Sequence, residues 1–397
     1  MTSPAPLLAW PTAIAGDRKP PQPAQYNWVT ERFDAVLPPE QLSLSLPEQA
    51  DTYESGPATL LATETGSQLL VSGFGLSVGK SSERLVVKQK GKICAQVPLL
   101  KLQEIVIGSR GISLSSDLIE ELCVRGIRIA FLMGSGRPFA LLTSPLLNAT
   151  VETRRAQFVA RESAVGVEIA RWIVAGKLRN QERLLRYFAR TRGSEVSEKL
   201  LRTAGSLKSL RRQAQAAEGS TCAEVRPTLM GLEGTGGRLY WQCLGLLTPD
   251  SGFRGRVHQG PADGVNAALN YGYGILTSHV WGAIMNAGLE PFAGFLHVDR
   301  SGKPSLALDL VEEFRQPVVD RAIFAWLTKG GRLTLRGDML DPPSKEQVAA
   351  RVLARLNTRE KHRGKEHEVR SIIQMQARLC ASAVREQRVY RPFTFSW

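Results

Sequence analysis

The chain has 397 residues, and its 51 Lys and Arg residues against 37 Asp and Glu residues give a net charge of +14. Hydrophobic residues make up 43% and charged residues 22%, an ordinary balance that excludes a wholly disordered or collagen-like chain. The positive excess favours a polyanionic partner, with nucleic acid ahead of an anionic membrane surface.

Residues 1–57 form a proline-rich, acidic extension, since nine of the 22 prolines fall before Ala50. Such a composition is typical of a poorly ordered segment, and its aromatic residues leave docking on a partner as the alternative. We see no secretory leader, and the five cysteines stand singly with no Cys-x-x-Cys pair. This excludes a Cys-framed zinc or iron–sulfur site of the usual spacing and predicts a reducing cytoplasm.

Residues 58–147 are predicted to form a small β-rich domain. Short runs of β-favouring residues follow one another, with glycine-containing turns between several of them. The runs are 68–72, 84–88, 93–97, 104–107, 127–132 and 139–143. One helix interrupts them between Ser115 and Gly126, with a Ser start signal and Gly at its end.

Residues 148–397 show a helical period and predict a larger all-α domain, so the fold class is α+β. Two helices broken near Gly176 are expected between Val151 and Arg192. The segment from Val151 to Ala217 contains 15 Lys or Arg residues and only six Asp or Glu residues. Helices with such a basic excess can bind along the phosphates of a nucleic-acid backbone. The stretch Gly264–Leu289 has no charged side chain, but its Asn, His, Ser and Thr residues indicate a buried helix rather than a membrane span.

One segment of the chain matches a phosphate-binding motif in part. The segment from Gly73 to Ser81 ends like a Walker A loop, but Phe74 occupies the place of its required first glycine. We therefore interpret the segment as a glycine-bearing β-turn and exclude nucleotide hydrolysis.

A histidine and several carboxylates predict a metal site. His297 ends a strand-like run, and Asp309 and Glu312 are spaced i, i+3 so that both can point to one helix face. Glu313 is also able to pair with Asp309, so spacing alone does not choose between the two glutamates. Carboxylates with one imidazole suit Mg²⁺ or Mn²⁺, and Mn²⁺ in particular.

A third carboxylate completes such a site. Glu233 stands among glycines, and an apolar helix start is expected after it. Taken singly, each of these residues is more typical of a structural role, as a satisfied core histidine or a capping carboxylate. Asn266, Asn270 and Tyr273 form an i, i+4, i+7 stripe, which we interpret as a polar stripe satisfied inside the core, with direct substrate contact as the alternative.

Together these motifs resemble the catalytic integrase family of CRISPR adaptation, over about residues 58–395. The motifs that carry the resemblance are 231–238 around Glu233, Phe253-Arg254-Gly-Arg256, 263–273, 294–297 ending at His297, 308–315 with Asp320-Arg321, and the closing 390–393. Gly236 and Gly237 stand where the family usually has alanine. The acidic extension lies outside the resemblance.

The resemblance implies that Glu233, His297 and Glu312 bind the metal and that Asp309 supports them. It implies a homodimer, assembled with the small second adaptation subunit on double-stranded DNA from the protospacer and the CRISPR repeat. The implied reaction is attack by a DNA 3′-hydroxyl on a phosphodiester at the repeat, with no ATP. Residues in or near these motifs are our candidates for DNA contact: Arg238, Arg254, Arg256, Asn266, Tyr271 and Arg315.

Two other functions remain open at this point. A structure-selective metal-dependent nuclease would use the same site with water in place of the 3′-hydroxyl. A non-catalytic nucleic-acid-binding scaffold would need the basic helices only, with the acidic cluster serving a structural role.

Overall fold

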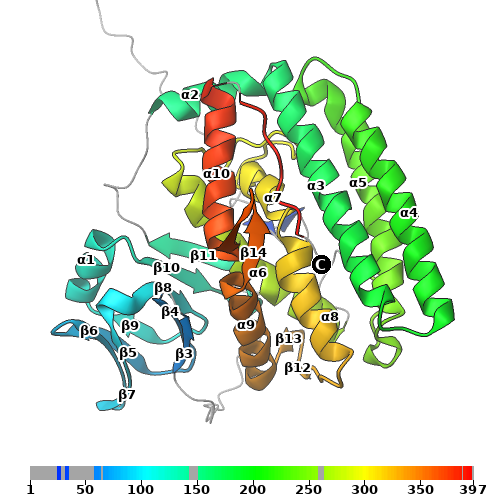
Figure 1. The fold of residues 1–397 in the computed structure, drawn as a ribbon. Coiled ribbons are helices and arrows are strands. Elements are labelled where there is room, and N and C mark those ends of the chain that lie inside the picture. Colours follow the sequence, from blue (N-terminus) through cyan, green and yellow to red (C-terminus); the bar gives the residue numbers. More distant parts are fainter. Residues whose placement is uncertain are drawn as a thin grey trace, which may run out of the picture.

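The computed structural model describes residues 25–27, 32–34, 58–63, 66–142, 151–257, 263–386 and 388–395. A β-rich part precedes a larger helical part, as the α+β prediction requires (Figure 1). The expectations for the extension 1–57 fall outside the described residues, apart from the paired strands β1 (Gln25–Asn27) and β2 (Arg32–Asp34).

The β-rich part consists of two sheets. One has the order β11-β10-β8-β4-β3 and the other β7-β6-β5-β9, and Leu and Val side chains such as Leu69 and Val87 are buried in the core of this part. The strands are β3 (Ala58–Thr63), β4 (Gly66–Val71), β5 (Leu76–Ser81), β6 (Arg84–Gln89), β7 (Lys92–Pro98), β8 (Leu102–Ile107), β9 (Ile112–Leu114), β10 (Arg128–Leu132) and β11 (Pro138–Leu142). The predicted helix is α1 (Ser116–Val124).

The Walker-like segment is a turn followed by a strand. Gly73 and Gly75 have φ values of 133° and 72°, which side chains with a Cβ rarely adopt, and the chain then enters β5. Lys80 of β5 forms an ion pair with Glu121 of α1. The segment therefore has a structural role, as its sequence indicates.

The helical part contains nine helices and two short hairpins among the described residues. The helices are α2 (Val151–Arg161), α3 (Ala164–Ala189), α4 (Ser194–Ala216), α5 (Cys222–Gly245), α6 (Gly264–Asn286), α7 (Ser305–Val311), α8 (Arg321–Leu327), α9 (Pro342–Asn357) and α10 (Val369–Glu386). A π-helical segment, Arg315–Asp320, lies between α7 and α8. The hairpins are β12 (Leu335–Arg336) with β13 (Met339–Leu340), and β14 (Arg359–His362) with β15 (Lys365–Glu368).

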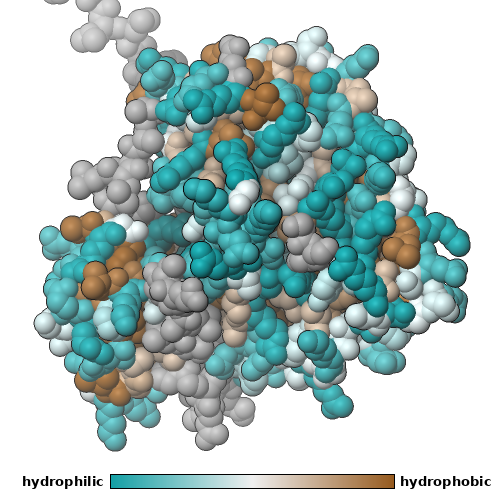
Figure 2. All heavy atoms as spheres, viewed as in Figure 1, coloured by the Kyte–Doolittle hydropathy of each residue, from teal (hydrophilic) through white to brown (hydrophobic). Residues whose placement is uncertain are grey.

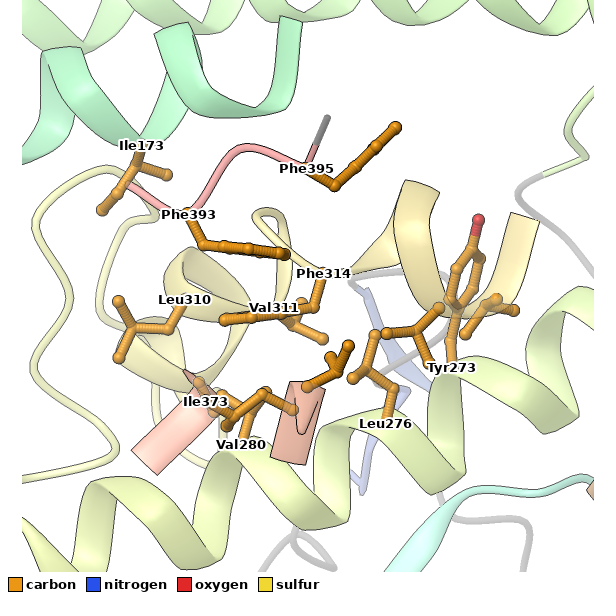
Figure 3. Packing of buried hydrophobic residues seen from close by; sticks show 14 of the residues in the cluster. Ile173, Tyr273, Leu276, Val280, Leu310, Val311, Phe314, Ile373, Phe393 and Phe395 are labelled. Carbon is orange, nitrogen blue, oxygen red and sulfur yellow. The ribbon is translucent and has the colours of Figure 1, made fainter. Parts of the chain in front are cut away.

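Helix α6 is at the centre of the helical part and is buried along almost all of its length, which explains why it carries no charged side chain. It packs against α7, α9 and α10, while α3, α4 and α5 form a bundle beside it (Figure 1). Figure 3 shows Tyr273, Leu276 and Val280 of α6 among the apolar side chains of this core. No helix in the described ranges is long and apolar enough to cross a membrane.

Three local predictions were wrong. His297 does not end a strand but lies in the loop between α6 and α7. The break between α2 and α3 falls at residues 162–163, not near Gly176, which lies inside α3. Glu233 does not precede a helix but lies in the middle of α5, which begins at Cys222 after the capping residue Thr221. Close packing explains one of the neighbouring glycines: a Cβ at Gly236 would lie 2.3 Å from a methyl carbon of Leu178 on α3, whereas a Cβ at Gly231, Gly234 or Gly237 would meet nothing within 4 Å.

The turn between β10 and β11 joins the two parts. Gly136 in this turn has a φ of 87°, and a Cβ there would lie 2.3 Å from the Cα of Tyr271 on α6. Nearby, Nε2 of His279 on α6 lies 2.5 Å from Oε2 of Glu104 on β8, and both side chains are buried. The β-rich part is therefore fixed directly against the central helix.

Candidate functional site

A cavity of about 530 Å³ opens where α3, α5, α6, α7 and the β10–β11 turn meet. Glu233, His297 and Glu312, three residues far apart in the sequence, all line it. Its other polar or charged lining residues are Lys177, Arg137, Arg238, Gln242, Arg254, Arg256, Tyr273, Thr277 and Arg315. The cavity thus combines a small acidic centre with several arginines.

His297 is held in place by Asp309 of α7. Oδ1 of Asp309 lies 2.6 Å from Nδ1 of the imidazole and also accepts the backbone N–H of His297 at 3.0 Å. Oδ2 accepts the backbone N–H groups of Phe295 and Leu296 at 2.6 and 3.0 Å. Because Nδ1 faces the carboxylate, a metal ion bound by this imidazole would be held through Nε2.

The two neighbouring glutamates at the end of α7 have different surroundings. Glu312 lines the cavity, and its Oε1 forms an ion pair with Arg315 at 3.0 Å. Glu313 points elsewhere: it is completely buried and accepts hydrogen bonds from Tyr390, Gln376 and the backbone N–H of Phe393. The structure therefore resolves the ambiguity that spacing left, with Glu312 on the cavity side.

Lys177 of α3 bridges the two cavity glutamates. Its ammonium lies 2.7 Å from Oε2 of Glu312 and forms a close ion pair with Glu233 of α5. Burial alone lowers the pKa of Lys177, but the attraction of the two carboxylates outweighs it and raises the pKa above its usual value. A positive charge is thus built into the space between these glutamates.

These residues suit a divalent ion by their chemistry. Two carboxylates and an imidazole are donors that Mg²⁺ and Mn²⁺ accept, and Oε2 of Glu312 contacts the ammonium without receiving a well-formed hydrogen bond. Within the described ranges, however, no three His, Cys, Asp or Glu side chains are gathered closely enough to hold a metal ion. The ammonium of Lys177 lies between the carboxylates of Glu233 and Glu312.

Tyr273 and two arginines form the wall of the cavity next to Glu312. The guanidinium of Arg315 lies 4.8 Å from the centre of the Tyr273 ring, and that of Arg256 lies 5.5 Å from it. The Tyr273 hydroxyl donates to Asp320 at 2.5 Å, and burial raises the pKa of Asp320 to about 6. These contacts hold both cationic side chains against a rigid aromatic surface.

The predicted DNA-contacting residues divide into two groups. Arg238, Arg254, Arg256 and Arg315 all line the cavity. Asn266 and Tyr271 do not line it. Asn266 is fully buried and joins the start of α6 to the preceding loop, since its Oδ1 accepts from Arg256 at 2.8 Å and its Nδ2 donates to Gly255 at 3.0 Å. Tyr271 is buried against the β10–β11 turn.

Sequence reasoning missed two charged cavity residues, Lys177 and Arg137. Lys177 stands among many basic residues of a long amphipathic helix, and only its burial distinguishes it. Arg137 follows the turn glycine Gly136 in the β-rich part, so its place in a cavity of the helical part depends on the packing of the two parts. A local pattern contains neither kind of information.

Comparison with known proteins identifies the family of this chain. The family model for CRISPR associated protein Cas1 matches residues 69–335, which include the candidate residues Glu233, His297, Asp309 and Glu312. The chain belongs to the Cas1 family.

Curated relatives extend the match over most of the chain. A CRISPR-associated endonuclease Cas1 of Archaeoglobus fulgidus is 34% identical over 346 residues, which are 83% of this chain and all of the relative. A CRISPR-associated endonuclease Cas1 of Pyrobaculum aerophilum is 38% identical over 64% of this chain and 80% of its own length. The chain is thus similar to named endonucleases along four fifths or all of their length.

Solved structures confirm the Cas1 fold. A Cas1 protein of Thermotoga maritima has a TM-score of 0.66 at 20% identity, and the match covers 82% of this chain and all of the other. A casposase bound to its integration product has a TM-score of 0.68 at 23% identity, over 82% of this chain and 93% of the other. At such identities the likeness establishes the architecture alone.

Proposed function

We propose that this Cas1 protein is a divalent-metal-dependent DNA integrase of CRISPR spacer acquisition, which joins the 3′-hydroxyl ends of short foreign DNA to the repeat. The observation that carries the proposal is the meeting of Glu233, His297 and Glu312 at one cavity bordered by arginines. An acidic centre suits a metal ion, and an arginine border suits the phosphates of a DNA strand.

In this proposal Glu233, Glu312 and Nε2 of His297 hold Mg²⁺ or Mn²⁺. A divalent ion supplies charge neutralisation at a phosphodiester during transfer and favours the deprotonated form of an attacking hydroxyl. Asp309 keeps the imidazole in the orientation that ligation needs.

The arginines bind and orient the DNA. Arg254 and Arg238 are exposed and sit at the border of the cavity, so they suit backbone phosphates outside the reacting group. Arg315 and Arg256 are held against Tyr273 and suit the phosphate beside the acidic centre. Since one phosphodiester replaces another, the reaction needs no nucleotide hydrolysis, and the Walker-like segment is correspondingly structural.

We further propose a homodimer and a complex with a small second subunit. Large apolar side chains are exposed on the β-rich part, among them Phe74, Ile93 and Leu100 at 69%, 54% and 88%. Figure 2 shows hydrophobic residues gathered over this part of the molecule, while hydrophilic residues cover most of the helical part. A matching structure titled Cas6-RT-Cas1–Cas2 complex supports the expectation of a second subunit, at a TM-score of 0.67 and 22% identity.

A strand-transfer assay tests the function. The protein and its small partner are incubated with 3′-hydroxyl duplex DNA, Mn²⁺ and a supercoiled plasmid that carries a repeat. We expect joined products from the unaltered protein and none from Glu233→Ala or His297→Ala. Joined products that persist in both variants refute the site, and products that are only hydrolysed indicate the nuclease instead.

A further inference from the structure

Residues 388–395, the C-terminal strap, come after α10 in the chain. The strap contacts α3 through Pro392 and Phe393, and it contacts the end of α7 through the backbone of Phe393. Its aromatic side chains Tyr390, Phe393 and Phe395 are buried almost completely, although the segment is neither helix nor strand. Figure 3 shows Phe393 and Phe395 inside the apolar core beside α3.

One contact region of the strap is Glu313, the residue after the cavity glutamate Glu312. The Tyr390 hydroxyl donates to its Oε1, and the backbone N–H of Phe393 donates to its Oε2 at 2.8 Å. The ring of Phe393 stacks on that of Phe314, with centres 5.5 Å apart and planes 14° from parallel. The end of α7 is therefore attached to the strap on the side away from the cavity.

The other contact region is one face of α3, next to the cavity lysine. Arg391 of the strap lies over the ring of Trp172, with 3.8 Å from guanidinium carbon to ring centre. Gly176 touches the strap so closely that a Cβ there would lie 2.6 Å from Cβ of Pro392. Arg183 donates to the carbonyl oxygen of Phe395. Gly176 directly precedes Lys177.

A single buried amide joins the two regions. Nδ2 of Asn180 on α3 donates to the carbonyl oxygen of Glu313 at 2.8 Å and to that of Phe393 at 3.0 Å. Gln376 of α10 likewise reaches both Glu313 and the strap carbonyl of Arg391. The strap, α3 and the end of α7 thus form one hydrogen-bonded unit.

We infer that the C-terminal strap is a positioning element for the catalytic centre, which sets the place of Glu312 relative to α3 and Lys177. This inference rests on the proposed function. The residues immediately before Lys177 and immediately after Glu312 both contact the strap, so displacement of the strap displaces both cavity side chains. Metal ligands require placement within a fraction of an ångström, and misplacement by about 1 Å can cost about 100-fold in rate.

The Gly176→Ala variant tests the inference in the full-length chain. Alanine favours the helical conformation of α3, while its methyl group collides with Pro392. The matched control is Gly205→Ala on α4, where a Cβ would meet nothing within 4 Å. In the strand-transfer assay we expect Gly176→Ala to lose about 100-fold in kcat with the KM for DNA unchanged. Its affinity for Mn²⁺ is expected to fall, and the control is expected to match the unaltered protein.

A second variant ends the chain after Gln387 and is assayed with and without a synthetic peptide of residues 386–397. We expect the shortened chain to lose activity and the peptide to restore it. The inference is overturned if Gly176→Ala leaves both kcat and Mn²⁺ affinity unaltered. It is also overturned if the shortened chain is fully active without the peptide. If the unaltered protein itself forms no joined product, the proposed function fails, and Mn²⁺ affinity alone then decides whether the strap positions the site.

Discussion

The imidazole of His297 and the carboxylate of Asp309 are in direct contact, with 2.6 Å between Nδ1 and Oδ1. The carboxylate also accepts three consecutive backbone N–H groups from residues 295–297, so it fixes the loop that carries the histidine as well as the ring itself. Asp309 therefore positions His297, and it lies three residues before the cavity glutamate Glu312 at the end of the short helix α7.

Asp309→Asn is expected to lower both Mn²⁺ affinity and strand transfer by about 10–100-fold, the usual cost of losing the carboxylate behind a metal-binding histidine. An amide NH₂ group cannot accept the hydrogen bonds that this carboxylate receives. Calorimetric Mn²⁺ titration and the strand-transfer assay measure the two effects. Asp341→Asn, which alters a carboxylate that caps α9 away from the cavity, is the control. Equal losses in both variants would show a general folding defect.

Lys177→Met is expected to make stability depend on the metal ion. Removal of the ammonium leaves Glu233 and Glu312 to repel each other, and breaking a buried ion pair typically costs about 3–5 kcal/mol of unfolding free energy. A bound Mn²⁺ ion adds about 2.7 kcal/mol to the free energy of unfolding when its concentration is 100 times its Kd. Thermal unfolding of the variant and of the unaltered protein, each with and without Mn²⁺, measures this effect. The interpretation is contradicted if Mn²⁺ raises the Tm of the variant no more than it raises the Tm of the unaltered protein.

Arg254→Ala is expected to weaken DNA binding about equally for all sequences. A contact with a backbone phosphate carries no sequence information, and its loss reduces the slope of log K against log salt by about 1. Fluorescence anisotropy over a range of salt concentrations gives that slope. The control is Arg84→Ala on the exposed part of β6, outside the cavity. A slope that changes equally in both variants speaks against a role for the cavity arginines.

His362 is expected to make the fold acid-sensitive. Burial, assisted by Arg363 and His367, lowers the pKa of His362 to about 4 from an unfolded value of about 6.5. The unfolded chain therefore binds the extra proton first, so stability is present above pH 6.5 and is lost as the pH falls through about 4. The ring packs against Phe393 of the strap, with 5.8 Å between centres.

Urea unfolding of His362→Gln between pH 7 and pH 4.5 tests this dependence. We expect the variant to lose less stability than the unaltered protein over that range, because glutamine does not take up a proton. Parallel curves for the two proteins would assign the acid sensitivity to other groups.

Residues with a periodic or motif-based signal were predictable from the sequence. The alternation of β-favouring runs and turns located the strands β4, β6, β7, β8, β10 and β11, and the charge-free stretch located α6. The ordered motifs indicated Glu233, His297, Asp309 and Glu312, but the i, i+3 and i, i+4 spacings alone did not separate Glu312 from Glu313. Their separation depends on the strap, which returns from about 80 residues further along the chain.

Glycines were the least reliable guide. Gly176 was predicted to break a helix, and the neighbours of Glu233 to precede one, yet both lie inside α3 and α5. At two of these glycines the lack of a side chain allows close packing, against Pro392 for Gly176 and against Leu178 for Gly236. A glycine that ends a helix and a glycine that allows close packing look the same in the sequence, and only the residues packed around them in the fold distinguish the two roles.

The most direct measurement for the central claim is a Mn²⁺ titration followed by electron paramagnetic resonance on four variants of the metal-free protein. If Glu233, His297 and Glu312 hold one ion together, Glu233→Gln, His297→Asn and Glu312→Gln each weaken the same single site, while Glu182→Gln, a buried carboxylate of α3 paired with Arg186, leaves it intact. Unchanged Mn²⁺ binding in the three cavity variants would contradict the account.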